Sequence, residues 1–533
     1  MSRDKIIMKN ISLTQAVRDA YASGQEDEAL EPIVKFSASG RPLGRIEPGD
    51  SVIFYDIRGE REIELTRSLT EDHFAHFARA ENLGLHFVTM IAYDPALKAV
   101  VAFPPEGKIK NTLTEVVTRA GLRVAKIAES EKAVHVGYFL NGKNDELFPG
   151  EGRFTPPSPE GVVSYARTPE MSAGLVVEEI IAKIDDPEYG LIIANLANVD
   201  VVGHIEDREA VLKAVETVDH SLGRIADACR PRGATLAITS DHGTVEEWLY
   251  PDGTVNTGHT KNPVPFVLAD FSRPDGALRL REAGELADVA PTVLSLLDIK
   301  PPNEMTGRSL VSGRRALPRA GRPLVLLILD GWGLREPGPG NLISAARTPR
   351  FEELWRAWPH AVLQSSGEAV GMPEGTVGNS EAGHLHLGAG RRLLSDRVRI
   401  DRAIDDGRFF SNAALLAAMD SAKTRGRALH LQGIVSHYSS HGTLRHLFAL
   451  LDMAKRQGLN EVFVHGFIGR RGEKPESGAI YVDKVIEKTA ELGCGELVTV
   501  IGRFWALDRE GNWDRIEKCY RALVGGEGTP VSG

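Results

Sequence analysis

The chain has 533 residues, of which 42% are hydrophobic, and its 73 acidic and 63 basic residues give a net charge of −10. This composition is ordinary for a globular protein and excludes disorder as the main state. The negative charge argues against a nucleic-acid-binding surface. The most continuous apolar run, at 324–329, is far shorter than the ~20 residues that span a bilayer. We therefore expect neither nucleic acid nor a membrane as a partner.

Three cysteines occur, Cys229, Cys494 and Cys519, and no pair has the spacing of metal ligands. So few thiols cannot form a disulfide framework in a chain of this length. The N-terminus lacks the long apolar stretch of a signal peptide. These features predict a cytoplasmic location, where thiols stay reduced.

Strand-like and helix-like segments alternate along the chain. In chain order, strands are predicted at 51–56, 191–197, 235–239, 324–329, 462–464 and 498–501, with amphipathic helices at 206–229 and 444–455. Continuously apolar strands belong in sheets buried on both faces. The alternation predicts an α/β fold. The basic, proline-broken stretch at about 312–322 has no periodicity, and we expect a flexible linker there.

Acidic residues follow three of these strands: Asp200, Asp241 and Asp330. Functional groups of open α/β sheets gather at the carboxyl ends of the strands, so the three acids could converge on one site. Asp200 and His204 are four apart, which suits either a shared metal or a plain surface pair. His242 directly follows Asp241, and adjacent acid and imidazole groups can face different ions.

Two further segments add candidate groups. His259 lies in the segment 257–265. A lone histidine is usually structural, so His259 is a candidate site residue only because of the other candidate groups. Ser380 lies in a glycine-flanked turn at 378–384 and is either a helix-capping serine or a nucleophile. A serine hydroxyl needs a base or a metal to attack anything. Mixed oxygen and imidazole ligands suit Mn²⁺ or Zn²⁺ better than Ca²⁺.

Arginines follow three of the predicted strands. They are Arg58 and Arg61 after the first strand, Arg470 and Arg471 after the strand at 462–464, and Arg503 and Arg509 after the strand at 498–501. Each guanidinium can hold a phosphate or carboxylate with two parallel hydrogen bonds. The pattern is equally compatible with an anion pocket and with solvated surface charges.

Taken together, these motifs resemble the cofactor-independent (2,3-bisphosphoglycerate-independent) phosphoglycerate mutases of the alkaline phosphatase superfamily. The resemblance covers nearly the whole chain, and its specific matching segments include 127–132, 195–204, 240–243, 259–265, 329–333 and 378–384. The resemblance implies an alkaline-phosphatase-like three-layer domain and a second α/β transferase domain.

The order of the segments differs from the family's order. The family begins with the segment that here starts near Pro323, and its inserted transferase domain is here divided between the two ends of the chain. The sequence therefore resembles a circular permutant, a rearrangement tolerated at exposed positions. The implied domains are the second half of the transferase domain at 1–107, the metal domain at 108–394 with its linker at about 312–322, and the first half of the transferase domain at 395–533.

The resemblance also implies roles for individual residues. One metal is expected on Asp200, His204 and His259, and the other on Asp330, Ser380, Asp241 and His242. Ser380 is the expected nucleophile and Lys132 neutralises the transferring phosphoryl group. The expected substrate-binding residues are Arg58, Arg61, Arg471, Arg503 and Arg509. His441 matches a histidine that handles protons of the glycerate hydroxyls.

The implied enzyme interconverts 2- and 3-phosphoglycerate through a phosphoserine. We expect a monomer with two divalent ions, Mn²⁺ first and Zn²⁺, Co²⁺ or Mg²⁺ as alternatives, and without 2,3-bisphosphoglycerate. Two acids of the family's glycerate-reading motifs are replaced, by His437 and Gly472. An alternative is therefore a phosphotransferase or phosphatase for another small phosphorylated or phosphonylated acid. A non-catalytic metabolite-binding protein is a third hypothesis, and the complete set of metal ligands counts against it.

Overall fold

The computed structural model describes residues 10–79, 83–105, 107–159, 161–162, 164–250, 252–273, 278–312, 322–437, 439–469 and 476–532. The chain divides into two compact units. Unit 1 contains Met1–Pro105 and Asp396–Gly533, and unit 2 contains Glu106–Ser395. Each unit contains one eight-stranded sheet among its described residues.

The sheet of unit 2 is parallel over most of its width. Its strands, in spatial order, are β10 (Ala283–Glu285), β12 (His360–Gln364), β9 (Val264–Asp270), β8 (Thr235–Thr239), β11 (Leu324–Leu329), β7 (Tyr189–Leu196), β5 (Arg123–Ile127) and β6 (Glu151–Phe154). Strand β9 runs antiparallel to β8 and to β12. The strands from β8 to β6 run parallel, so their carboxyl ends share one edge of the sheet.

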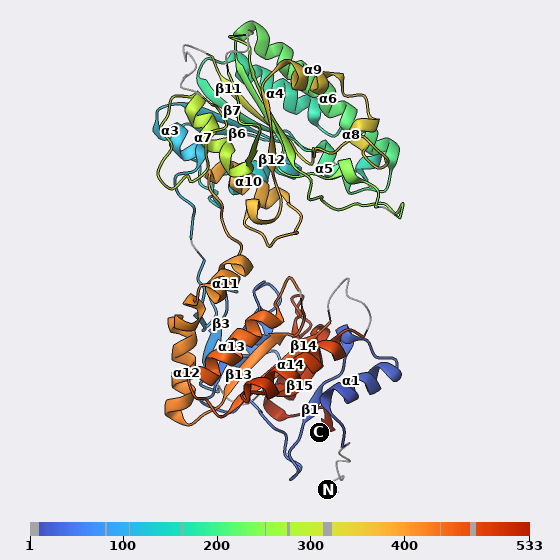
Figure 1. Ribbon diagram of the computed structural model, residues 1–533, viewed down its shortest axis with the longest axis vertical. Coiled ribbons are helices and arrows are strands. Elements are labelled where there is room, and N and C mark those ends of the chain that lie inside the picture. The colour runs from blue at the N-terminus through green and yellow to red at the C-terminus, as the bar shows by residue number, and fades with distance from the viewer. Residues whose placement is uncertain are drawn as a thin grey trace. The chain divides into compact units, whose positions relative to one another are not determined.

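Unit 2 has three layers, with helices on both faces of the sheet (Figure 1). Alternate residues of β11 enter two different cores: Val325, Leu327 and Leu329 pack in one, and Leu324, Leu326 and Ile328 pack in the other. The helices against the first core are α4 (Ala173–Asp185), α5 (Asn198–Gly203), α6 (Arg208–Arg232), α8 (Leu342–Ala345) and α9 (Pro349–Ala357). Those against the second are α3 (Leu113–Arg119), α7 (Val289–Leu296) and α10 (Ser380–Ala389).

Local signals set the ends of the long helix α6. The Asp207 side chain caps its start by accepting a hydrogen bond from the amide of Ala210. Gly233 ends it in the left-handed conformation, at φ 56°, which glycine adopts without steric cost. The predicted helix at 206–229 is confirmed; it begins at Arg208 and continues to Arg232, with Pro231 inside its last turn.

Unit 1 contains the second sheet. Its strands, in spatial order, are β16 (Thr529–Val531), β1 (Ile33–Lys35), β15 (Glu496–Gly502), β14 (Val462–Ile468), β13 (Leu429–Ile434), β2 (Ser51–Phe54), β3 (His86–Thr89) and β4 (Val100–Val101). The strands from β15 to β4 are parallel, and β1 is antiparallel to β15. Strands from the first and last hundred or so residues are thus neighbours in this sheet.

Helices also cover both faces of this sheet. One core holds α1 (Leu13–Ala22), α11 (Asp396–Asp405), α12 (Ala413–Arg425), α13 (Leu444–Arg456) and α14 (Gly478–Leu492). The other holds α2 (Ile63–Thr70), α15 (Arg503–Ala506) and α16 (Trp513–Tyr520). Ile53 and Tyr55 enter the first core, while Val52 and Phe54 enter the second.

The predicted α/β class is confirmed, and so are the predicted strands. The runs at 235–239 and 324–329 form β8 and β11 without change, and the strand at 462–464 extends to Ile468. Most of the predicted linker lies outside the described residues, because these exclude 313–321. The three cysteines are free and buried. Within the described residues, no helix is both long enough and apolar enough to span a bilayer.

Candidate active site

The carboxyl ends of the central strands of unit 2 bring three acids together. Asp330 directly follows β11, Asp241 follows β8, and Asp200 lies in α5, just after β7. Backbone contacts join the loops, since the Asp200 amide donates to the Asp330 carbonyl at 3.1 Å. The Gly331 amide donates to Asp241 Oδ1 at 3.3 Å. All three carboxylates are buried.

Ser380 is the first residue of α10 and lies among these acids. The Asn379 side chain caps the helix by accepting from the Ala382 amide at 2.8 Å. Ser380 Oγ lies 2.7 Å from Lys132 Nζ, 3.0 Å from His242 Nε2 and 3.4 Å from Asp330 Oδ1. Because Asn379 performs the capping, the hydroxyl of Ser380 is available for chemistry.

Glycines let the serine helix approach the acids. A Cβ atom on Gly383 would lie 2.6 Å from both the Cβ and the carbonyl oxygen of Asp241. Real Cβ atoms do not approach that closely, so only glycine permits this packing of α10 against the Asp241 loop. A side chain at this position would displace Ser380 from the carboxylates.

Lys132 is the single ammonium group within this cluster of described residues. Its Nζ lies 2.6 Å from Asp200 Oδ2 and 2.9 Å from Asp330 Oδ1. Burial alone would lower the pKa of Lys132, but the carboxylates of Asp330, Asp200 and Asp241 outweigh it and raise that pKa above its usual value. Lys132 therefore stays charged and can stabilise negative charge next to Ser380.

Two histidines direct ring nitrogens at one carboxylate oxygen. His204 Nε2 lies 3.3 Å and His259 Nε2 lies 3.2 Å from Asp200 Oδ1. Their Nδ1 atoms bond backbone carbonyls instead, of Thr257 at 2.6 Å and Gly378 at 2.9 Å. A histidine that donates from one nitrogen to a carbonyl presents the other as a metal ligand. The arrangement suits a metal held by Asp200, His204 and His259.

His242 lies between this group and the other acids. Its Nε2 is 3.5 Å from both Asp241 Oδ2 and Asp330 Oδ1, and 3.6 Å from Asp200 Oδ1. Burial alone would raise the pKa of Asp241, but nearby His242, His384 and Lys132 hold that pKa well below its usual range. This carboxylate is therefore ionised although it is fully buried.

The charges and donors of the cluster fit bound cations. Three buried carboxylates surround one lysine, and buried charge of this kind needs compensation. Asp241 Oδ2 is buried without a hydrogen-bond partner. The nearest imidazole nitrogen, His384 Nδ1, lies 3.2 Å away but bonds the Ser380 carbonyl. Oxygen and imidazole groups together are a set that Mn²⁺ and Zn²⁺ accept.

Sequence reasoning missed two supporting residues, His384 and Asn195. His384 Nδ1 bonds the Ser380 carbonyl at 2.9 Å, and its Nε2 lies 3.0 Å from Asn195 Nδ2. The same Asn195 amide donates to Asp330 Oδ2 at 2.7 Å. His384 thus ties the serine helix to the Asp330 strand. Its position four residues after Ser380, on the same helical face, was the available signal.

Buried Glu246 fixes the loops that carry the histidines. It accepts from the Thr244 amide at 2.9 Å and from Asn262 Nδ2 at 3.0 Å, and the Thr260 hydroxyl also donates to it. A Cβ atom on Gly333 would lie 2.2 Å from the Glu246 carboxyl carbon. Glycine at 333 therefore leaves room for this carboxylate, which joins the loops after β8, before β9 and after β11.

Unit 1 contains the predicted arginines and His441. Arg58 and Arg509 both pair with Glu60, at 3.7 Å and 2.8 Å, and Arg61 donates to the Leu507 carbonyl at 3.1 Å. These three therefore gather in one place. Arg503 directly follows β15 and pairs instead with Glu28 at 3.1 Å, whereas Arg471 and Gly472 lie outside the described residues. His437 is exposed.

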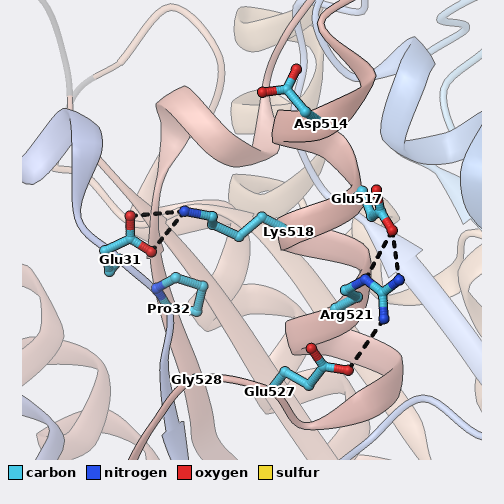
Figure 2. Close-up of a pocket in the computed structure, with 8 residues that line it drawn as sticks. All are labelled: Glu31, Pro32, Asp514, Glu517, Lys518, Arg521, Glu527 and Gly528. Carbon is cyan, nitrogen blue, oxygen red and sulfur yellow. Dashed lines mark hydrogen bonds and ion pairs between the residues drawn. The ribbon is translucent and has the colours of Figure 1, made fainter. Parts of the chain in front are cut away.

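Unit 1 also has a surface pocket, shown in Figure 2, whose charged side chains pair with one another. Lys518 bonds Glu31 at 2.9 Å, and Arg521 pairs with Glu517 at 2.6 Å and with Glu527 at 3.5 Å. None of the predicted site residues is among the described residues that line it. Its charges are satisfied internally, so we do not assign the chemistry to it.

Comparisons with known proteins show what the chain is similar to. A model of the metalloenzyme superfamily matches residues 17–301, and a model described as the N-terminus of BPG-independent phosphoglycerate mutases matches residues 400–532. The 2,3-bisphosphoglycerate-independent phosphoglycerate mutase of Moorella thermoacetica is 46% identical over 301 residues, 56% of this chain and 57% of the relative. That of Syntrophotalea carbinolica is 42% identical over the same shares.

A solved phosphoglycerate mutase of Leishmania mexicana, studied at low cobalt concentration, is 28% identical with a TM-score of 0.37. The match covers 52% of this chain and 53% of the Leishmania chain. The chain thus spans a little over half the length of the curated relatives that it matches.

The chain belongs to the metalloenzyme superfamily, because that model matches more than half of its residues. Within this superfamily, its likeness is to the 2,3-bisphosphoglycerate-independent phosphoglycerate mutases.

Removal of divalent metal is expected to destabilise unit 2. A ligand that binds only the folded state stabilises it by about 2.7 kcal/mol at a free concentration 100 times its Kd. We expect calorimetry of the Mn²⁺-loaded chain to show a lower unfolding temperature after a chelator is added. In the Asp241→Asn variant this difference should shrink, whereas Asp252→Asn, at an exposed loop of the same unit, should keep it. Equal unfolding temperatures with and without metal would contradict the metal assignment.

Proposed function

We propose that this protein is a metal-dependent phosphomutase that interconverts 2- and 3-phosphoglycerate through a phosphoserine at Ser380. One observation carries the proposal: an ammonium group, an imidazole and a carboxylate all lie within 3.4 Å of the Ser380 hydroxyl. A serine so placed is typical of nucleophilic catalysis. The matched mutases support the substrate assignment.

Two divalent ions complete the site in this proposal. Asp200, His204 and His259 would hold one, and Asp330, Asp241, His242 and Ser380 would hold the other. When bound, such ions lower the pKa of an attacking hydroxyl and offset the charge of a phosphoryl group. Mn²⁺ is our first candidate, with Zn²⁺, Co²⁺ and Mg²⁺ as alternatives, because the donor set mixes oxygen and nitrogen.

The chain's own residues then carry the transfer. Ser380 Oγ attacks phosphorus, and the bond from phosphorus to the first glycerate oxygen breaks. The second glycerate hydroxyl next attacks the phosphoserine, which releases Ser380. Lys132 donates hydrogen bonds to the phosphoryl oxygens in both steps, where its fixed charge stabilises the transition state. The arginines of unit 1 hold the phosphate and carboxylate of the substrate, and His441 handles protons of its hydroxyls.

The substrate-binding role of the arginines gives a kinetic prediction. Arg509→Ala is expected to raise KM about tenfold or more, because a charged hydrogen bond contributes about 1.5–3 kcal/mol, while kcat changes less. Arg456→Ala is the matched control, since Arg456 is an exposed arginine of α13 that pairs only with Asp452 among the described residues. Steady-state kinetics with 3-phosphoglycerate measure both parameters. An unchanged KM for Arg509→Ala would remove this arginine from the binding site.

We also propose that the chain is a circular permutant in which unit 1 is the transferase domain and unit 2 the metal domain. The order of the matches supports this, because the model described as a mutase N-terminus lies at residues 400–532. Unit 1 supports it as well, since it joins the first and last parts of the chain in one sheet. A cytoplasmic location, a monomeric state and independence of 2,3-bisphosphoglycerate stay predictions.

Product analysis tests the function. The Mn²⁺-loaded protein is incubated with 3-phosphoglycerate, the metal is removed with a chelator, and phosphorus NMR identifies the products. A 2-phosphoglycerate signal is the expected result. Free phosphate would instead support the phosphatase alternative, which the replacements at His437 and Gly472 keep open. If no product forms with Mn²⁺, Zn²⁺, Co²⁺ or Mg²⁺, the protein does not turn over 3-phosphoglycerate, and both the mutase and the phosphatase hypotheses are contradicted for this substrate.

A further inference from the structure

Unit 1 contains a second buried cluster of titratable groups, formed by Asp56, Glu62 and His441. Asp56 follows β2, Glu62 immediately precedes α2, and His441 lies in the loop after β13. Asp56 and Glu62 are 0% exposed and His441 is 2% exposed. Each offers an oxygen or nitrogen atom, and these atoms all lie within 4.8 Å of one another. Nothing in the sequence pattern linked the two acids to His441.

Glu62 binds one ring nitrogen of His441 and leaves the other free. His441 Nδ1 lies 2.7 Å from Glu62 Oε1, and the other oxygen of Glu62 accepts from the Arg61 amide at 3.1 Å. The backbone of His441 is also held, because its carbonyl accepts from the Ile57 amide at 2.5 Å. Among the residues that the structure describes, no hydrogen bond reaches His441 Nε2. The imidazole is therefore fixed in orientation, with Nε2 as its open position.

Asp56 completes the cluster as a second acid. Its Oδ1 accepts from the Ile434 amide at 2.8 Å, whereas its buried Oδ2 has no partner. Cβ atoms on Gly433 and Gly442 would lie 2.6 and 2.8 Å from Oδ1, so glycines make room for this carboxyl group. Burial first, and then the charge of Glu62, raise the pKa of Asp56 well above its usual range. Asp56 therefore favours its neutral form and adds no second negative charge beside Glu62.

The negative charge of the cluster lies on Glu62. Tyr55 and Tyr93 pack beside it, and burial together with the neighbouring acids raises the pKa of both phenols well above the usual value. Both phenols are therefore neutral. Arg58 is an exposed cation nearby and donates to Ser440 at 3.3 Å. One carboxylate next to one imidazole is the arrangement that stabilises an imidazolium.

We propose that Glu62 is a positioning residue that holds Nδ1–H of His441, so that Nε2 exchanges protons with the substrate hydroxyls. This inference rests on the proposed mutase function. The inference also bears on the altered motifs. Where the family has two acids, this chain has His437 and Gly472, and it has two buried acids beside His441 instead.

The proton balance over one turnover closes. Ser380 enters the first step and leaves the second as its alkoxide, the form that bound divalent ions would favour, so its own proton does not enter the balance. As the Ser380–phosphorus bond forms, the departing glycerate oxygen takes the proton from Nε2 of the His441 imidazolium. As the second hydroxyl attacks the phosphoserine and the Ser380–phosphorus bond breaks, that hydroxyl returns its proton to Nε2. Nδ1–H remains bonded to the Glu62 carboxylate in both states. No proton is consumed, as an isomerisation requires.

Glu62→Gln tests the inference, because it keeps an oxygen acceptor for Nδ1–H and removes only the charge. We expect kcat to fall about 10²-fold, within the range of acid–base contributions, with little change in KM. The limb of the pH–rate profile that reports His441 should move to lower pH, since the imidazolium has lost its counter-charge. Glu62→Asp should recover part of kcat.

One variant serves as the control. Glu64→Gln changes another buried glutamate of the same helix region, which accepts from the Gly511 amide at 2.9 Å, and it should leave the pH profile in place. Thermal unfolding of each variant shows whether it folds.

A readout independent of turnover separates this inference from the proposed function. In full-length protein labelled with ¹⁵N-histidine, the His441 ring signals, assigned by their loss in His441→Gln, should change over a lower pH range in Glu62→Gln than in wild type. The same titration range in both would overturn the inference even if mutase activity is present. Loss of a bound divalent ion in Glu62→Gln, measured by elemental analysis, would overturn it too, because the cluster would then be a cation site. Absence of mutase activity alone would contradict only the proposed function.

Discussion

Replacement of Ser380 by alanine is expected to lower kcat for 2-/3-phosphoglycerate interconversion by about 10³-fold or more, because the variant has no oxygen to accept the phosphoryl group. The fold should survive, since Asn379 and not Ser380 caps α10. Stopped assays that count 2-phosphoglycerate over long incubations measure the residual rate. Ser344→Ala is the matched control, because Ser344 also lies in a helix of unit 2 and, within the described part of the chain, bonds only the backbone and side chain of Asn341.

The outcome distinguishes nucleophilic catalysis from simple substrate binding. A variant that still interconverts the two phosphoglycerates at a tenth of the wild-type rate would show that Ser380 is not the phosphoryl acceptor. Retained metal content in Ser380→Ala, measured by elemental analysis, is also expected, because three further groups remain at the metal site proposed to include Ser380. Loss of both metals would assign the defect to metal binding instead.

Lys132→Met is expected to have the second large effect. It removes the ammonium group that lies 2.7 Å from Ser380 Oγ, and we expect kcat to fall about 10²–10³-fold, as when one donor to a developing charge is lost. In metal-free protein the variant also leaves three buried carboxylates without their ammonium partner. Removing one partner of a buried ion pair costs about 3–5 kcal/mol, so the unfolding temperature should drop.

Divalent metal should restore much of this stability, because the cations compensate the same carboxylates. Lys126→Met is the matched control: Lys126 is another buried lysine of unit 2, 3.5 Å from Glu151, and burial lowers its pKa to about 7. It should alter stability without the large loss of kcat. If metal-free Lys132→Met unfolds at the wild-type temperature, Lys132 does not compensate the buried acids.

The sequence predicts the framework of the site because that framework depends on local patterns. The apolar runs at 235–239 and 324–329 form strands without change, and the acids after them meet at one edge because the strands are parallel. The amphipathic pattern at 444–455 forms α13, one residue longer than predicted. Periodicity and strand direction suffice for these features.

Residues whose partners are distant in sequence could not be predicted in this way. Glu62 contacts His441 although the two are 379 positions apart in the sequence, and Asn195 contacts His384 at a separation of 189 positions. Glu62 immediately precedes an amphipathic helix, where an acid is ordinarily read as a favourable charge at the helix start. Only the adjacency of β2 and β13 in the sheet brings it beside the histidine loop.

The proposed mechanism requires the phosphoryl group to pass through Ser380. The most direct test is to incubate the Mn²⁺-loaded protein with 3-phosphoglycerate, quench it with acid, and map the phosphorylated peptide by mass spectrometry. One phosphoryl group is expected on Ser380 in wild type and in Glu62→Gln, and none in Ser380→Ala. Formation of 2-phosphoglycerate with no phosphoryl group on Ser380, or with one on another residue, would contradict it.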